Sequence, residues 1–408
     1  MRCILFASLL SVVAPAPLLS PAPNATVLPD RYIVRLNQNN TEPVLRIASG
    51  TTDGQDIHHV YDVGSFKGFA ATLSQSALLD LQDNDAVSSI EPDTIVSTAL
   101  FAVQNPSAWN LARISHHNRS SNGAQKYIYD SSGGGCTCAY IIDTGIYTAH
   151  SEFGGRAYAI ANFSPENNTN DNNGHGTHVA GTVGAATYGV AKNVTLLGVK
   201  VLGASGTGAA SDVVAGIAFA ANDFAAFNRS SQCGKGGVAN LSISGPLTPA
   251  LNDAVRAAVE KGLFMAVAAG NNGQNASGYS AGSVAQACTV GATDADDSRA
   301  AFSNWGASVD VWAPGVSILS TWNTGPTATN TLDGTSMAAP HVAGLAAYLT
   351  ALEGERSPAD LCNRIQQIAT KGLVTNIDNT GSPNYLAYND NERLEKVASR
   401  PKLQLLEV

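Results

Sequence analysis

Charged residues and long apolar runs are both scarce in this chain of 408 residues. Only 13% of the residues are charged, and the net charge of −9 argues against a nucleic-acid partner. No stretch approaches 18 uninterrupted apolar residues, so we expect no membrane anchor. With 44% hydrophobic residues the chain can instead bury a large core, and its length allows two or three domains.

The first 20 residues have the pattern of a secretory signal peptide. Met1 and Arg2 precede an apolar run over residues 4–13, which prolines end and which is too short to span a bilayer. We therefore expect a secreted protein, with the vacuole as the alternative destination. Asparagine sequons fit this route, although Asn240 lies in an apparent buried strand and is expected to be unmodified. The sequons are Asn24, Asn39, Asn118, Asn162, Asn167, Asn193, Asn228, Asn240 and Asn275.

Residues 28–98 differ in pattern from the rest and predict a small α+β module of about 70 residues. Its expected strands are 30–36, 69–73 and 87–93, with a capped helix over 74–83. A binding domain and a prodomain fit this pattern equally well. A weakly patterned stretch, 94–104, follows and predicts a linker.

Apolar strands and helical patterns alternate from Trp109 onward. Strands are expected at 138–142, 194–202, 238–243 and 264–268, and helices at about 178–187, 211–227 and 249–261. Apolar strands separated by helices indicate a parallel sheet covered on both faces, hence an α/β domain of three layers. Active groups gather at the carboxyl ends of such strands, where Asp143 and Asn271 both fall.

The segment 334–341, GTSMAAPH, places a serine where a helix begins. Backbone N–H groups and the helix dipole favour negative charge at such an end, so Ser336 can serve as a nucleophile; a simple helix N-cap is the alternative. Pro340 is expected in the first turn, where its missing N–H bonds nothing. Apolar residues recur at helical spacing after it and predict a buried helix: Val342, Leu345, Leu349 and Leu352.

Two further motifs supply a histidine and a carboxylate. His175 lies between glycines in residues 173–181, NGHGTHVAG, and Asp143 begins an Asp-Thr-Gly segment at a strand end. Alternatives are a structural histidine, an Asx-turn at Asp143, or a metal site from His175 and His178 with Cys136 or Cys138. The two cysteines lack a matching downstream pair, which weakens the metal alternative.

Together the three motifs, in the order Asp, His, Ser, resemble the signatures of subtilisin-like serine proteases, most of all the fungal proteinase K branch. The resemblance covers about residues 109–389. It implies that Ser336 is the nucleophile, His175 the general base and acid, and Asp143 the residue that orients His175. It also implies that Asn271 donates to the oxyanion beside the Ser336 backbone N–H.

The resemblance implies two backbone segments that hold an extended peptide, and an apolar specificity pocket. Where relatives have glycine this chain has Ser244, whose hydroxyl is expected to narrow the pocket entrance. Cleavage is therefore expected after apolar or aromatic residues. The substrate-binding residues implied are Gly206, Thr207, Gly208, Ser242, Ile243, Ser244, Gly245, Ala268, Ala269 and Gly270.

Cysteine pairing and calcium are also implied by the resemblance. It pairs Cys138 with Cys233 and Cys288 with Cys362, and it leaves Cys136 over. Asp310 resembles the carboxylate of a structural calcium site, whose other ligands would be carbonyls and water near Ala285 and Ala287. A second, weaker site is not expected, because His117 and Leu373 occupy its ligand positions. No catalytic cofactor is expected.

The expected organisation is a signal peptide (1–20), an inhibitory propeptide (21–101), a subtilisin-like catalytic domain (102–389) and a charged tail (390–408). The expected function is that of a monomeric endopeptidase that acts on polypeptides, is inhibited by its own propeptide, and cuts itself near Phe101–Ala102. Two other classes remain open: a catalytically silent binding protein of the same fold, and a metalloenzyme using His175 and His178.

Overall fold

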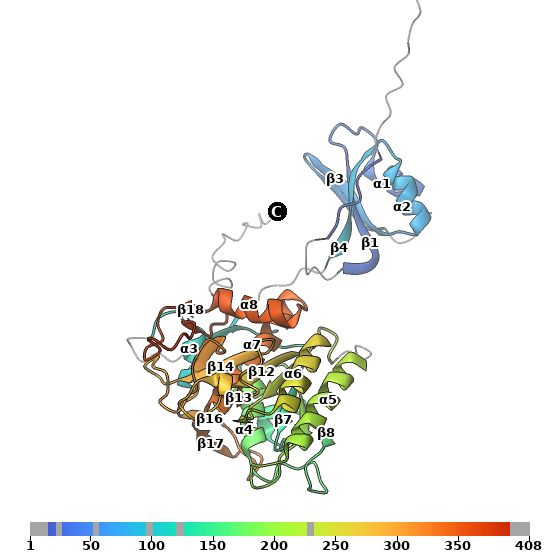
Figure 1. The fold of residues 1–408 in the computed structure, drawn as a ribbon. Helices are drawn as coiled ribbons and strands as arrows, with labels where there is room; N and C mark the ends of the chain where they lie inside the picture. The colour runs from blue at the N-terminus through green and yellow to red at the C-terminus, as the bar shows by residue number, and fades with distance from the viewer. Residues whose placement is uncertain are drawn as a thin grey trace, which may run out of the picture. The chain divides into compact units, whose positions relative to one another are not determined.

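The computed structural model describes residues 15–21, 27–51, 57–94, 101–119, 126–226 and 232–391. The chain divides into two compact units, Met1–Thr98 and Ala99–Val408 (Figure 1). The first signal-peptide residues, part of the expected linker and nearly all of the expected tail lie outside the described residues.

The first unit is an antiparallel sheet with two helices. The sheet order is β2-β3-β1-β4, and the apolar residues of its strands pack with both helices around Val34, Phe69 and Ile90. Ser74 caps α2 by accepting a hydrogen bond from the Ala77 N–H (3.2 Å), as the sequence predicted. The predicted strands and capped helix are confirmed, whereas α1 and β2 were not predicted. The elements are β1 (Val27–Leu36), α1 (Val44–Thr51), β2 (Ile57–Val63), β3 (Phe66–Thr72), α2 (Gln75–Gln82) and β4 (Val87–Thr94).

The end of the expected signal peptide packs on this unit. Leu18 forms a bridge with Ile90, and the Ala16 N–H donates to the Gln82 carbonyl (2.6 Å). Ala16 is buried in the core of the unit. Residues 16–19 therefore pack with the first unit, and the signal peptide over residues 1–20 stays a prediction.

The second unit is built on a nine-stranded sheet of order β18-β19-β15-β14-β12-β10-β7-β9-β8. Every neighbouring pair is parallel except β18 and β19, which confirms the predicted parallel sheet. Its strands are β7 (Cys138–Asp143), β8 (Ala157–Asn162), β9 (Thr195–Lys200), β10 (Gly237–Leu241), β12 (Phe264–Ala268), β14 (Cys288–Thr293), β15 (Val311–Pro314), β18 (Thr370–Lys371) and β19 (Tyr385–Leu386).

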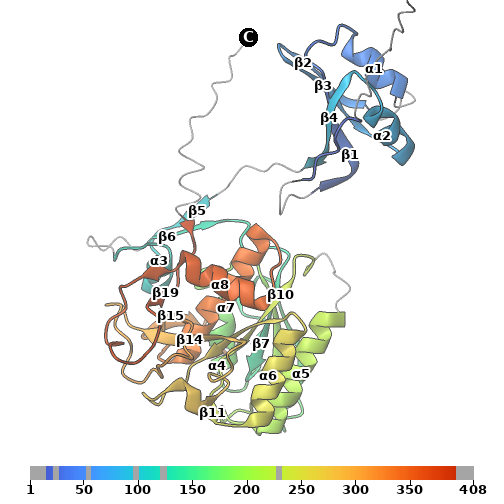
Figure 2. The same cartoon turned by 45° about the horizontal axis from the view of Figure 1, so that its top comes forward.

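Helices cover both faces of this sheet, and each face has its own core (Figures 1 and 2). Successive side chains of a strand point to opposite faces, so in β7 Ala139 and Ile141 enter one core while Tyr140 and Ile142 enter the other. The first core contains α4 (His175–Gly184), α7 (Thr335–Glu353) and α8 (Pro358–Ile368), and the second contains α5 (Ala210–Ala226) and α6 (Pro249–Glu260).

Part of the expected linker is a strand of the second unit. Phe101–Gln104 forms β5, which pairs antiparallel with β6 (Tyr127–Asp130) in a separate two-stranded sheet. The four-residue strand is too short to show a clear alternation in the sequence. The remaining elements are α3 (Trp109–Ile114), the pair β11 (Gly245–Pro246) and β13 (Tyr279–Ser280), and the pair β16 (Ile318–Thr321) and β17 (Thr329–Leu332).

Both expected disulfides are present. Cys138 is bonded to Cys233 and Cys288 to Cys362, and Cys136 is free and exposed. Each bridge closes a long loop, an arrangement that typically contributes about 2–5 kcal/mol to stability. Among the described helices, none is both long enough and apolar enough to cross a membrane.

Candidate active site

Asp143 and His175 meet at the carboxyl edge of the large sheet. Asp143 is the last residue of β7 and is fully buried, and His175 is the first residue of α4. The His175 Nδ1 lies 2.7 Å from the Asp143 Oδ1, which also accepts the Thr144 N–H (2.8 Å). Gly174 precedes the histidine at φ 108°, and a Cβ there would lie 2.5 Å from the Trp322 ring. A glycine is therefore required where the chain turns His175 toward Asp143.

The environment of His175 favours its protonated form. Burial lowers its pKa, but the charge and the hydrogen bond of Asp143 outweigh this effect, and the charge of Asp171 adds to them. The pKa of His175 is therefore raised from its usual value of 6.5. A carboxylate that stabilises an imidazolium in this way lowers the cost of taking up a proton during catalysis.

Asp171 fixes the segment that presents His175. Its Oδ1 accepts hydrogen bonds from the Thr144 hydroxyl (2.8 Å) and the Gly174 N–H (2.8 Å), and its Oδ2 accepts from the Thr177 N–H (2.9 Å) and hydroxyl (2.5 Å). It thus joins the residue after Asp143 to both sides of His175. Sequence reasoning missed Asp171; the available signal was an acidic residue close to the histidine in a chain poor in charge.

Ser336 and Ser242 exchange hydrogen bonds. The Ser336 hydroxyl donates to the Ser242 carbonyl (3.0 Å), and the Ser242 hydroxyl donates to the Ser336 carbonyl (2.7 Å). The Ser242 hydroxyl in turn accepts the Asn240 side-chain N–H (2.9 Å). In this conformation the Ser336 hydroxyl donates to the backbone and not to His175. In many enzymes the hydrogen bond between the nucleophile and its base forms fully only when substrate binds.

The position of Pro340 corrects one expectation. The helix α7 begins at Thr335, so Pro340 lies past the first turn, where a residue would normally donate to the Ser336 carbonyl four positions back. The Ser242 hydroxyl replaces that missing donor. Proline is tolerated because a residue from another segment satisfies the exposed carbonyl.

Asn271 is held in one orientation beside Ser336. Its Oδ1 accepts both the Thr335 N–H and the Thr335 hydroxyl, each at 2.8 Å. Among the described residues this leaves the Asn271 side-chain NH₂ available to a ligand. Asn304 supports the same loop, since its Oδ1 accepts the N–H groups of Asn272 and Gln274 (3.0 Å each).

A cleft of about 330 Å³ brings these groups together. Seven residues singled out in the sequence line it: His175, Gly206, Ser242, Ile243, Ser244, Asn271 and Ser336. Ala268 and Ala269 are buried behind it, and Thr207, Gly208, Gly245 and Gly270 do not line this cavity. A larger cavity, about 770 Å³, lies beside the Cys138–Cys233 disulfide and contains none of the catalytic candidates.

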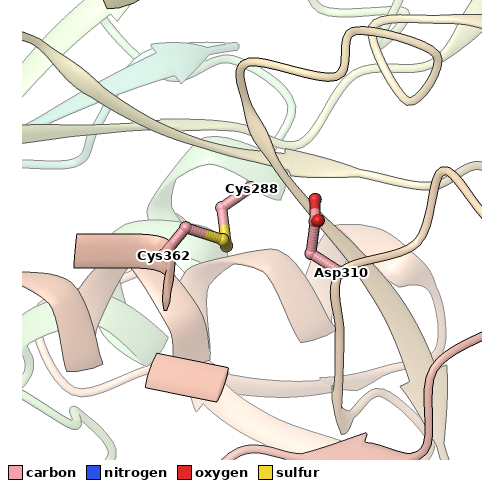
Figure 3. Close-up of side chains that lie close together, drawn as sticks. All are labelled: Cys288, Asp310 and Cys362. Atoms are coloured by element: carbon pink, nitrogen blue, oxygen red, sulfur yellow. A yellow bond between two sulfur atoms is a disulfide. The ribbon is translucent and has the colours of Figure 1, made fainter. Parts of the chain in front are cut away.

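The alternative metal site is contradicted. Cys138 is in a disulfide, and the Nε2 of His178 lies 2.9 Å from the Ile318 carbonyl and 3.2 Å from that of Asn330. Burial lowers the pKa of His178 to about 4, so the ring is neutral, and its Nε2 donates to these carbonyls and cannot bind a metal. In the described part of the chain, the one cluster of potential metal-ligating side chains is Cys288, Asp310 and Cys362, and its cysteines are bonded to each other (Figure 3).

The chain belongs to the subtilase family of serine proteases. The model of the subtilase family matches residues 138–384, and that of the peptidase inhibitor I9 family matches residues 31–99. The protein is therefore a serine endopeptidase of the subtilisin type with an inhibitory propeptide domain. This assignment replaces the two alternatives, a catalytically silent binding protein and a metalloenzyme.

Named relatives agree with this assignment. The chain is 45% identical to the subtilisin-like serine protease AsES of Sarocladium strictum, covering 92% of this chain and 94% of that protein. It is 43% identical to the cuticle-degrading protease of Metarhizium anisopliae (92% and 93%) and to proteinase R of Parengyodontium album (92% and 92%). Among solved structures, a cold adapted subtilisin-like serine proteinase matches with a TM-score of 0.64 and 39% identity, covering 70% of this chain and 98% of that one.

Proposed function

We propose that the protein is a secreted endopeptidase that cleaves peptide bonds through an acyl-enzyme on Ser336. The observation that carries this proposal is the 2.7 Å hydrogen bond between Asp143 and His175, beside the cleft that His175 and Ser336 both line. His175 takes the proton of the Ser336 hydroxyl as the serine attacks the carbonyl carbon, and then gives it to the leaving amine. Asp143 holds the imidazole in position and stabilises its charged form.

The oxyanion of the tetrahedral intermediate is held by the Asn271 side-chain N–H and the Ser336 backbone N–H. The fixed Oδ1 of Asn271 supports this role, because a donor that is already oriented needs no reorganisation during the reaction. The loss of one such donor typically lowers turnover by roughly 10²–10³-fold.

The substrate lies as an extended strand between residues 206–208 and 242–245, with an apolar or aromatic side chain before the cleaved bond. Ala268, Ala269 and Gly270 provide no charge that would hold Lys or Arg. Ser244 limits this pocket, since its Oγ lies 2.8 Å from where a Cβ of Gly270 would be. Broad specificity at other positions follows from recognition through the backbone.

Active-site labelling tests the assignment. The purified mature enzyme should react with a fluorophosphonate at Ser336, located by mass mapping of the adduct. Ser336→Ala should lose the label and more than about 99.9% of peptide hydrolysis while keeping its circular dichroism spectrum. Ser211→Ala, at an exposed serine of α5, is the matched control and should behave as wild type. Hydrolysis that persists in pure Ser336→Ala protein would exclude the proposed nucleophile.

We further propose that the enzyme removes its own propeptide close to Phe101–Ala102. Phe101 pairs with Asp130, whose N–H donates to the Tyr348 hydroxyl (2.8 Å), and Tyr348 lies about 18 Å farther along α7 than Ser336. Cleavage must therefore precede the pairing of β5 with β6, or β5 must detach. Sequencing the N-terminus of wild-type and Ser336→Ala proteins, produced in a protease-deficient host, tests this. Trimming of the inactive precursor at the same bond would assign processing to another protease.

Subtilases commonly bind structural calcium, and we propose one site at Asp310. Its Oδ2 accepts the Thr289 N–H (2.8 Å), and the Gln366 amide lies 3.4 Å from its Oδ1, so one carboxylate oxygen is only weakly bound by the protein. Burial raises the pKa of Asp310 to about 6, as for a carboxyl without a cationic partner. Asp310 would hold the ion with carbonyl groups near Ala285 and Ala287, and the ion would supply stability, not catalysis.

A further inference from the structure

Lys200 is a fully buried cation on the strand next to that of Asp143. It ends β9 and is the register partner of Asp143. Its ammonium group donates to the carbonyls of Thr144 (2.7 Å) and Leu202 (2.8 Å) and lies 3.1 Å from the Glu166 Oε2. All three of its N–H donors are thus used, and Glu166 is the charge that compensates it. A buried charge of this kind is stable only while its partner stays in place.

Glu166 also holds the segment of the chain that borders the cleft. Its Oε1 accepts the Ala204 N–H (2.6 Å), and its Oε2 accepts the Asn172 side-chain N–H (2.9 Å). These bonds lower the pKa of Glu166, the Ala204 backbone bond most of all, so it is ionised at neutral pH. One carboxylate therefore ties Ala204 to the buried Lys200 and to the loop that leads to His175.

The segment 204–208 has little else to fix it. Ala204, Ser205, Thr207 and Gly208 are exposed, so few apolar contacts determine the position of the segment. Its other bonds are few. The Gly203 N–H donates to the Thr207 carbonyl (3.0 Å), and the side chain of Asn173, in the loop that leads to His175, donates to the Ala204 carbonyl (2.9 Å). Gly206 nevertheless lines the cleft, so its position must be set from outside.

We propose that Glu166, anchored on Lys200, is a positioning residue that sets the 204–208 segment at the distance needed to pair with an extended peptide. This inference rests on the proposed function. Glu166 does not touch the triad, so it controls the binding of residues some distance before the cleaved bond and leaves the chemistry at Ser336 unchanged. Long substrates depend on it, and short ones do not.

Kinetics with substrates of two lengths test this proposal. Glu166→Ala should raise KM for a four-residue peptide anilide about tenfold, with kcat within about twofold, and should leave a single-residue ester within about twofold of wild type. Glu166→Gln keeps an acceptor for Ala204 and should show a smaller effect of the same kind. Asp253→Asn, in the exposed pair with Arg256, is the matched control and should leave both substrates unaffected.

Amide hydrogen exchange gives a readout independent of activity. In mature enzyme inactivated at Ser336 with a fluorophosphonate, Glu166→Ala should speed exchange at residues 203–207 and leave 138–143 protected. Equal losses on the ester and the peptide, or unchanged KM together with unchanged exchange, would overturn the positioning role. Wild-type enzyme that cleaves neither substrate in a Ser336-dependent way would instead reject the proposed function, and the exchange result would then still decide whether Glu166 fixes the segment.

Discussion

The second unit holds its carboxylates in two different ways: Asp143 and Asp171 are buried, whereas Asp310 is partly buried. At the cleft, Asp143 accepts a bond from His175, and Asp171 accepts several from the residues around it. Asp310 lies directly before β15. Its carboxylate accepts one short bond, from the Thr289 N–H, and has no cationic partner among the described residues. His175 and the Thr144 N–H bond to the Oδ1 of Asp143, although its buried Oδ2 has no partner among the described residues, whereas the charge of Asp310 has no cation beside it.

We expect Asp143 to affect the reaction and Asp310 to affect folding stability. The charge at Asp143 acts on the pKa of His175, so its removal should alter the reaction. Asp310 does not line the cleft, so we expect its charge to affect the free energy of unfolding and not the reaction. Exchanging each carboxylate for its amide should therefore produce opposite results.

The largest effect is expected from Asp143→Asn. The amide keeps the shape but cannot stabilise the imidazolium and favours the wrong tautomer, so kcat should fall by about 10⁴-fold while the melting temperature changes little. Steady-state kinetics and calorimetry measure the two quantities. Asp310→Asn is the comparison and should keep kcat within about twofold; a similar loss of kcat in both variants would contradict the separation.

Calcium should stabilise the fold at a site whose one carboxylate is Asp310. Because burial raises the pKa of Asp310 from 3.8 to about 6, the folded state binds more protons than the unfolded state in that interval, and stability without calcium should fall as pH rises through it. Above pH 6 the ion offsets this loss. Saturating calcium should raise the melting temperature by about 5 °C at pH 8 and by little at pH 5.

Asp310→Asn provides the control for calcium. Without calcium it should match or exceed the wild type at pH 8, because it removes a partly buried charge that has no cation beside it, and calcium should no longer stabilise it. Scanning calorimetry with EDTA and with calcium distinguishes these cases. A calcium effect that persists in Asp310→Asn would place the ion elsewhere.

The dependence of kcat/KM on pH should reflect the interaction between Asp143 and His175. His175 must be neutral to accept a proton, so the acidic limb of kcat/KM should lie above pH 6.5, where its raised pKa falls. The contribution of His175 to folding stability changes with pH in the opposite direction to activity. It is fully present below pH 6.5 and is lost as pH rises through the folded-state pKa. In Asp143→Asn only the charge of Asp171 still opposes the effect of burial, so NMR titration of the ring should show a lower pKa than in the wild type. A limb at or below pH 6.5 in the wild type would refute the raised value.

The sequence predicted what short-range patterns determine. Apolar strands without alternation indicated the parallel sheet, and glycine-bounded motifs located Asp143, His175 and Ser336. Each of these depends on a few neighbouring residues: Gly174, for example, is required at φ 108° beside Trp322, and its presence next to the histidine is visible in the sequence. The roles of the motifs came from a family resemblance and not from spacing.

Long-range polar pairs were not predictable in this way. Lys200 meets Glu166 across a loop, and Ser242 compensates Pro340 from a distant strand end, so no local pattern indicates either pairing. A lysine at the end of the apolar strand 195–200 was a usable signal, since a cation there requires a partner. The short paired strands β5 and β6 were not predicted for the same reason, because the stability of each depends on a partner far along the chain.

The smallest expected effect concerns the specificity pocket. The Ser244 hydroxyl points at Gly270, so Ser244→Gly should widen the pocket and raise kcat/KM for Phe relative to Ala before the cleaved bond by about fivefold. Peptide anilides that differ only at this residue measure the ratio. Gly270→Ala is the opposing variant: its Cβ would lie 2.4 Å from the Asn304 amide at a φ of 104°, so it should close the pocket and disturb the loop of Asn271. An unchanged Phe-to-Ala ratio in Ser244→Gly would show that this hydroxyl does not limit the pocket.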